Sequence, residues 1–67
     1  MARVEYFDTE GKLLKSTDDM YDDLNIPAVG TVLEFESCQA KVESVTTLAC
    51  GIDVVEVIAT CRVLRYR

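Results

Sequence analysis

The sequence predicts a mostly β fold: a single small domain over residues 1–67 with about five short antiparallel strands. Apolar and polar residues alternate along several stretches, with the two-residue period of a half-buried strand. Turn-forming residues separate these stretches. The composition, 49% hydrophobic and 28% charged, is typical of a chain that folds rather than of a disordered tail.

The first predicted element is a hairpin. Residues 3–7 alternate in polarity, and after a turn at residues 8–11 a second stretch follows at residues 12–15. Gly11 can adopt the positive φ that ends many short loops, and the Asp8 side chain can cap the turn. We therefore expect two antiparallel strands joined by a tight turn.

Residues 16–27 predict a connection rather than a strand. The segment contains four aspartates and ends on Pro27, a composition with poor strand propensity. Ser16 or Thr17 could cap a helix, and acids are favourable in a first helical turn, so a short helical turn near residues 18–24 is one option. The chain then returns to an extended path, because the residue before a proline is disfavoured in the α region.

Three further strands are predicted after Gly30. They cover residues 31–36, 40–47 and 54–64, with breaks at 37–39 and 49–53. The tight first break suits antiparallel neighbours. In the last strand the odd positions from 55 to 63 are all apolar, whereas the even positions mix polar and apolar residues. We expect one face of this strand in the core and the other face only partly solvated.

A proline, a glycine and residues suited to strands mark the entry into this second part of the chain: Pro27, Gly30, Thr31, Val32 and Phe35. The pattern is similar to small SH3-like barrels, a likeness that covers about half of the chain and includes no diagnostic motif. The resemblance implies a strongly bent sheet or a partly open SH3-like barrel. It assigns no family.

The negative charge is concentrated in the first half of the chain. The net charge is −5, with nine acids against three bases in residues 1–36 and three acids against four bases in residues 37–67. A phosphate backbone would repel such a chain, so direct nucleic-acid binding is not expected. The acidic half instead predicts a protein partner with a basic surface, for example a nucleic-acid-binding protein, which the chain would modulate or inhibit.

The candidate partner-binding site is an acidic segment with an apolar centre: Asp18, Asp19, Met20, Tyr21, Asp22 and Asp23. An exposed methionine and tyrosine ringed by carboxylates would suit the centre of an interface. A solvated loop that only keeps the chain soluble is an alternative. Calcium binding is another, although the segment lacks the glycine and the distal glutamate of the twelve-residue calcium loop.

The alternative function is a structural or assembly subunit that self-associates through its sheet. Large apolar residues on the outer face of the last strand indicate it: Val54, Ile58, Leu64 and Tyr66. The C-terminal bases Arg62, Arg65 and Arg67 would then contact the acidic half of a second copy. In the simpler interpretation they are a solvated strand end.

No catalytic centre is predicted. The chain has no histidine, the commonest general base, and its three glycines are isolated rather than grouped in a phosphate-binding loop. Cys38, Cys50 and Cys61 include no CxxC pair, so we expect no metal or other cofactor and buried, reduced thiols, with one disulfide as the alternative. Together with the expected lack of a signal peptide or membrane span, these features predict a cytoplasmic protein that is not an enzyme.

Overall fold

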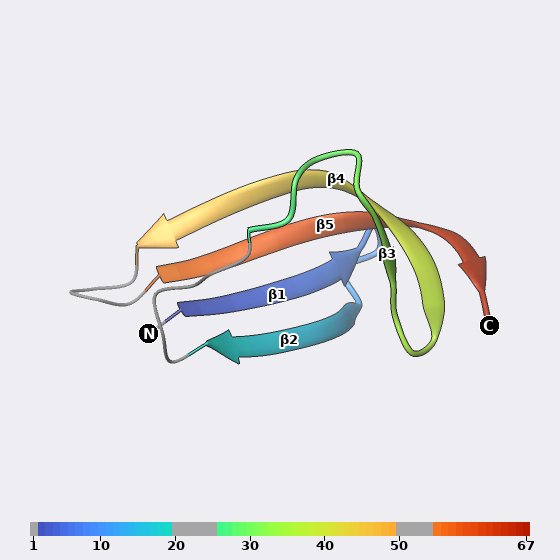
Figure 1. Cartoon of the computed structure of the whole chain (residues 1–67), viewed down its shortest axis with the longest axis horizontal. Coiled ribbons are helices and arrows are strands. Elements are labelled where there is room, and N and C mark those ends of the chain that lie inside the picture. Colours follow the sequence, from blue (N-terminus) through green and yellow to red (C-terminus); the bar gives the residue numbers. More distant parts are fainter. Residues whose placement is uncertain (1, 20–25, 50–54) are drawn as a thin grey trace.

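The computed structural model describes residues 2–19, 26–49 and 55–67. Within them, the strands are β1 (Ala2–Asp8), β2 (Leu13–Asp19), β3 (Val32–Glu34), β4 (Cys38–Ala49) and β5 (Val55–Tyr66). They form one five-stranded sheet in the order β2-β1-β5-β4-β3 (Figure 1). The described residues contain no helix, and the predicted mostly β fold is confirmed.

The sheet is mixed, which corrects the prediction of antiparallel strands throughout. β1 pairs antiparallel with β2, and β4 pairs antiparallel with both β3 and β5. β1 and β5, however, run parallel along the whole of β1, from the Ala2–Val55 pair to the Asp8–Cys61 pair. The first and last strands therefore meet at the centre of the sheet, and β5 has a partner along both of its edges.

The helical turn considered near residues 18–24 is wrong where the structure describes that segment. Asp18 and Asp19 belong to β2 and pair with the first residues of β1. Residues 20–25 lie outside the described residues. The strand propensity of this part of β2 is low, but propensity is a weak influence beside a continuous ladder of pairing with β1.

The turn between β1 and β2 has the predicted chemistry. Gly11 has a φ of 85°, and its N–H donates to the Asp8 carbonyl at 3.1 Å. The Asp8 side chain is buried, and its Oδ1 accepts hydrogen bonds from the N–H groups of Glu10 at 2.9 Å and Lys12 at 2.8 Å. A short loop that ends on a left-handed glycine is a common connection between antiparallel strands. The predicted hairpin is confirmed.

Replacing Gly11 with alanine should lower the free energy of unfolding by about 1 kcal/mol. Beyond the two adjacent residues, no atom lies within 4 Å of the position that a Cβ would take, so the cost is that of holding an L-residue at a positive φ and not that of a clash. Urea unfolding followed by circular dichroism would measure the change. Thr9→Ala, an exposed substitution in the same loop, is the control, and G11A as stable as the wild type would contradict this turn conformation.

The sheet is curled into a half-barrel. In the strand order β1 and β3 are three steps apart, which in a flat sheet would separate them by about 14 Å. Yet the rings of Tyr6, on β1, and Phe35, directly after β3, meet edge to face with their centroids 5.4 Å apart. The sheet must therefore bend so that its two sides approach each other across a concave face (Figure 1).

Irregularities in the strand registers explain this bend. An extra residue on one strand bends it and increases its local twist. Leu14 of β2, Glu43 of β4 and Leu64 of β5 are passed over in the registers with the neighbouring strand. All three lie in the half of the sheet that contains the β1–β2 turn and the C-terminal end of β5, where the curl is strongest (Figure 1).

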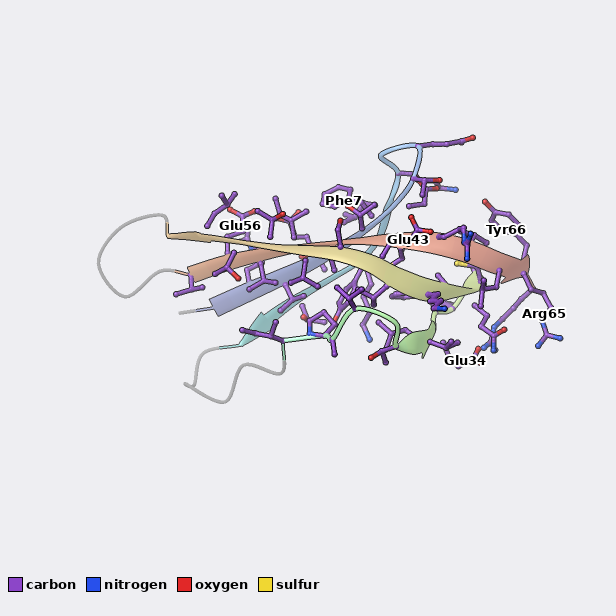
Figure 2. The ribbon with its side chains drawn as sticks, turned by 90° about the horizontal axis from the view of Figure 1, so that it is seen from above. Phe7, Glu34, Glu43, Glu56, Arg65 and Tyr66 are labelled. Carbon is purple, nitrogen blue, oxygen red and sulfur yellow. The ribbon has the colours of Figure 1, made fainter. Side chains whose placement is uncertain are left out.

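The core lies on the concave face. Its buried apolar residues are Val4, Phe35, Cys38, Ala40, Val42, Val57, Ala59 and Cys61. The odd positions of β5 from Val57 to Cys61 are fully buried, as the alternation predicts, whereas Ile58 and Thr60 are half-buried on the opposite, convex face. Figure 2 shows Phe7 and Glu56 on that convex side.

Candidate interaction surfaces

The acidic segment begins at the end of an edge strand. Asp18 and Asp19 are the last residues of β2, which pairs only with β1 among the described residues. The other predicted partner-binding residues, Met20, Tyr21, Asp22 and Asp23, lie outside the described residues. Figure 1 shows that β2 ends at one end of the long axis and that the C-terminus lies at the other end.

The chain contains no base for a long stretch after Lys15 of β2. Residues 16–33 hold four acids and no lysine or arginine. The register places one base, Arg3 of β1, opposite Asp18. Among the described residues at this end of the sheet, the acids Asp18, Asp19 and Glu56 outnumber Arg3, which favours a negative potential there.

The basic C-terminal end is bound to acids of its own chain. Arg62 Nε lies 3.2 Å from Glu43 Oε1, and Arg67 forms an ion pair with Glu34. The backbone N–H of Arg67 also donates to the Ser37 carbonyl at 3.0 Å, which fixes the end of the chain to the loop between β3 and β4. Two of the three bases expected to contact a second copy thus have partners within the chain.

Glu34 accepts hydrogen bonds from two directions. Gln39 Nε2 donates to its Oε1 at 2.6 Å, and Arg67 binds its other carboxylate oxygen. The Gln39 hydrogen bond first, and then the charges of Arg67 and Arg65, hold the pKa of Glu34 below its ordinary value. The carboxylate stays charged to lower pH, but because these side chains are exposed the ion pair adds little to stability.

The described members of the predicted self-association set do not form one patch. Ile58 is half-buried near the start of β5, whereas Leu64 and Tyr66 are exposed at its C-terminal end. Figure 2 shows Tyr66 at the opposite end of β5 from Glu56, two residues before Ile58. Val54 lies outside the described residues. Self-association through these residues stays a prediction.

The backbone of β1 shows which of its residues face β2. The Asp8 N–H donates to the Lys12 carbonyl at 2.9 Å, so the amide of Asp8 points toward the β2 side. The backbone groups of successive residues in a strand point to opposite sides, so the N–H and C=O groups of Tyr6 and Val4 point toward β2, as those of Asp8 do. The Thr17 hydroxyl agrees with this orientation, since it donates to the Val4 carbonyl at 3.4 Å.

The outer edge of β2 follows from this geometry, and the residue pattern did not reveal it. Lys15 and Thr17 are the register partners of Tyr6 and Val4, so their N–H and C=O groups point back to β1. The backbone groups of Ser16 and Asp18 consequently point outward. No described segment runs along this edge (Figure 1), which leaves a row of backbone donors and acceptors available to another strand.

Cys38 and Cys61 are free and fully buried in the core. Burial, and secondly the nearby thiol of Cys38, raise the pKa of Cys61 above its ordinary value. A buried thiol that stays protonated is a poor nucleophile. The prediction of buried thiols is confirmed for these two residues, and Cys50 lies outside the described residues.

No protein-family model, curated protein or solved structure matches this chain. In the part of the chain that the structure describes, no helix is long and apolar enough to cross a membrane. The same residues bring together no group of three side chains suited to hold a metal ion.

Proposed function

We propose that the chain is a non-catalytic protein-interaction module that binds a basic surface of another protein and modulates or blocks it. Basic faces of nucleic-acid-binding proteins are surfaces of this kind. The observation that carries the proposal is the acidic end of the sheet. Asp18 and Asp19 close an exposed edge strand, and two more aspartates, Asp22 and Asp23, follow directly along the chain.

The charge distribution along the molecule supports this role. The acidic end of β2 lies far from the C-terminal end, where Arg62 and Arg67 are paired with glutamates of the same chain (Figure 1). A basic partner is therefore attracted to one end of the sheet. Complementary charges raise the rate of association and make it sensitive to ionic strength.

Asp18→Asn together with Asp19→Asn should weaken binding to a basic partner by about tenfold, which corresponds to roughly 0.7 kcal/mol for each lost charge. The probes would be a panel of purified basic nucleic-acid-binding proteins, with poly-L-lysine as a reference for unspecific attraction. Isothermal titration calorimetry at low and at high salt would give the affinities. The wild-type complex should weaken as the salt concentration rises, because the attraction between exposed charges is screened.

The matched control is Glu10→Gln together with Glu36→Gln. It removes two exposed carboxylates from other parts of the chain and changes the net charge by the same amount. This control should bind almost as well as the wild type. Equal weakening by both double variants would show that binding depends on net charge alone. The absence of a salt-sensitive complex with every member of the panel would contradict the proposal.

A further inference from the structure

We propose that two copies of the chain pair through the outer edges of β2, antiparallel and centred on Thr17, to form one continuous sheet. β2 is the longer of the two edge strands, with seven residues against three in β3. The outward backbone groups of Ser16 and Asp18 have no partner strand among the described residues. An edge of this length is a template for a further strand.

A second copy of the same edge satisfies these backbone groups. In a two-fold antiparallel arrangement centred on Thr17, Ser16 of each copy stands opposite Asp18 of the other copy. Both are outward-facing residues, and an antiparallel pair of such residues exchanges two backbone hydrogen bonds. Symmetry repeats the pair on the other side of Thr17, which makes the interface self-complementary and closed.

The charges of β2 favour this register. Lys15 and Asp19 lie two residues before and two residues after Thr17. Each Lys15 therefore stands opposite Asp19 of the second copy, and the match occurs twice. Opposite charges directly across two antiparallel strands stabilise the pairing, whereas like charges oppose it.

The neighbouring registers with the same backbone parity lack this match. Centred on Ser16, the arrangement would set Lys15 against Thr17 and both aspartates against leucines. Centred on Asp18, it would set two aspartates against each other. Charges on an edge strand commonly prevent pairing with other strands. Here, charges of opposite sign at equal distances from Thr17 make the edge selective for its own copy.

Exchanging the two charges tests the pairing. Lys15→Asp places two carboxylates opposite each other, and Asp19→Lys places two ammonium groups opposite each other, so each variant alone should dimerise at least about tenfold more weakly than the wild type. An equimolar mixture of the two variants should dimerise, because every such pair then joins opposite charges. Sedimentation equilibrium would measure the mass of each sample in solution and compare it with the 7.5 kDa of one chain. Protein concentrations of about 10 µM to 1 mM cover the range in which two chains associate through a small interface.

Two controls separate the edge from overall charge. Lys12→Asp and Glu10→Lys make the same charge changes at exposed positions in the turn before β2, and both should dimerise like the wild type. The wild type and the mixture should approach twice the chain mass. The dissociation constant of the dimer should be at least about tenfold higher for K15D alone and for D19K alone. A wild type that stays monomeric, or a mixture that fails to dimerise where the wild type does, would overturn the proposal.

A second pair of variants tests the backbone without changing charge. Ser16→Pro removes an outward N–H from the edge and should abolish the dimer, because this N–H donates across the proposed interface. The single chain should still fold, since proline is tolerated at an edge position that does not donate to the neighbouring strand. Ser16→Ala keeps this N–H and should dimerise like the wild type. Equal dimerisation of S16P and S16A would show that the β2 edge is not the interface.

Discussion

Phe35→Ala is expected to leave the chain largely unfolded at room temperature. Phe35 is only 6% exposed, and its ring meets Tyr6 across the concave face of the sheet. Truncating a buried phenylalanine to alanine costs about 3–5 kcal/mol. A core in a chain of this size supplies only about 3–5 kcal/mol in total. Circular dichroism without denaturant, followed by urea unfolding, would measure the remaining folded fraction.

Two further variants separate the loss of this side chain from a general sensitivity to mutation. Phe35→Leu keeps most of the apolar volume and should fold with a loss of about 1.5 kcal/mol. Tyr66→Ala removes an aromatic ring that is 69% exposed and should change stability by less than about 0.5 kcal/mol. F35A with a wild-type unfolding midpoint would mean that the ring does not close the half-barrel.

The Tyr6–Phe35 contact also shows what the sequence could and could not predict. Local patterns predicted the strands, since alternation reports which residues of a strand share a face. The turn at Gly11 was predicted for the same reason, because its chemistry lies within a few consecutive residues. The contact itself joins β1 to the residue directly after β3, a strand three positions away in the sheet, and no pattern in either segment specifies it.

The parallel pairing of β1 with β5 could not be predicted for a related reason. Tight turns indicate antiparallel neighbours, but a parallel pair needs a long connection, here residues 9–54. The apolar residues on both faces of β5 were one signal of its central position in the sheet. A strand with a partner on each edge at the centre of a sheet is often apolar on both faces. For Ile58, which is half-buried on the convex face, the central position of β5 thus explains an apolar residue without a second copy.

The acidic segment is recognisable in the sequence, but its structure could not be predicted from it. Asp18 and Asp19 are the last residues of β2, whereas their low strand propensity predicts a connection. Hairpin symmetry was the signal that could have placed them in a strand. If the turn ends at Gly11 and the first strand starts near residue 2, the second strand must continue to about residue 19 to pair with all of it.

Asp8→Ala is expected to lower the free energy of unfolding by about 2–3 kcal/mol, a large share of the stability of a chain this small. The buried Asp8 carboxylate accepts the N–H groups of Glu10 and Lys12 through one oxygen, and these bonds hold the β1–β2 turn closed. Without the carboxylate, both N–H groups lose their acceptor. Urea unfolding followed by circular dichroism would measure the loss.

Asp8→Asn is the matched control, because the amide keeps an oxygen at the position of Oδ1 but not the charge. Hydrogen bonds to an ionised acceptor are roughly twice as strong as neutral ones, so D8N should lose about half as much stability as D8A. The loss of stability in D8N, which D8A shares, reports the contribution of the charge, and the additional loss in D8A reports the hydrogen bonds that a neutral oxygen at this position still accepts. D8A within about 0.5 kcal/mol of the wild type would contradict this, and would mean that the twist of β1 and β2 suffices to set the turn.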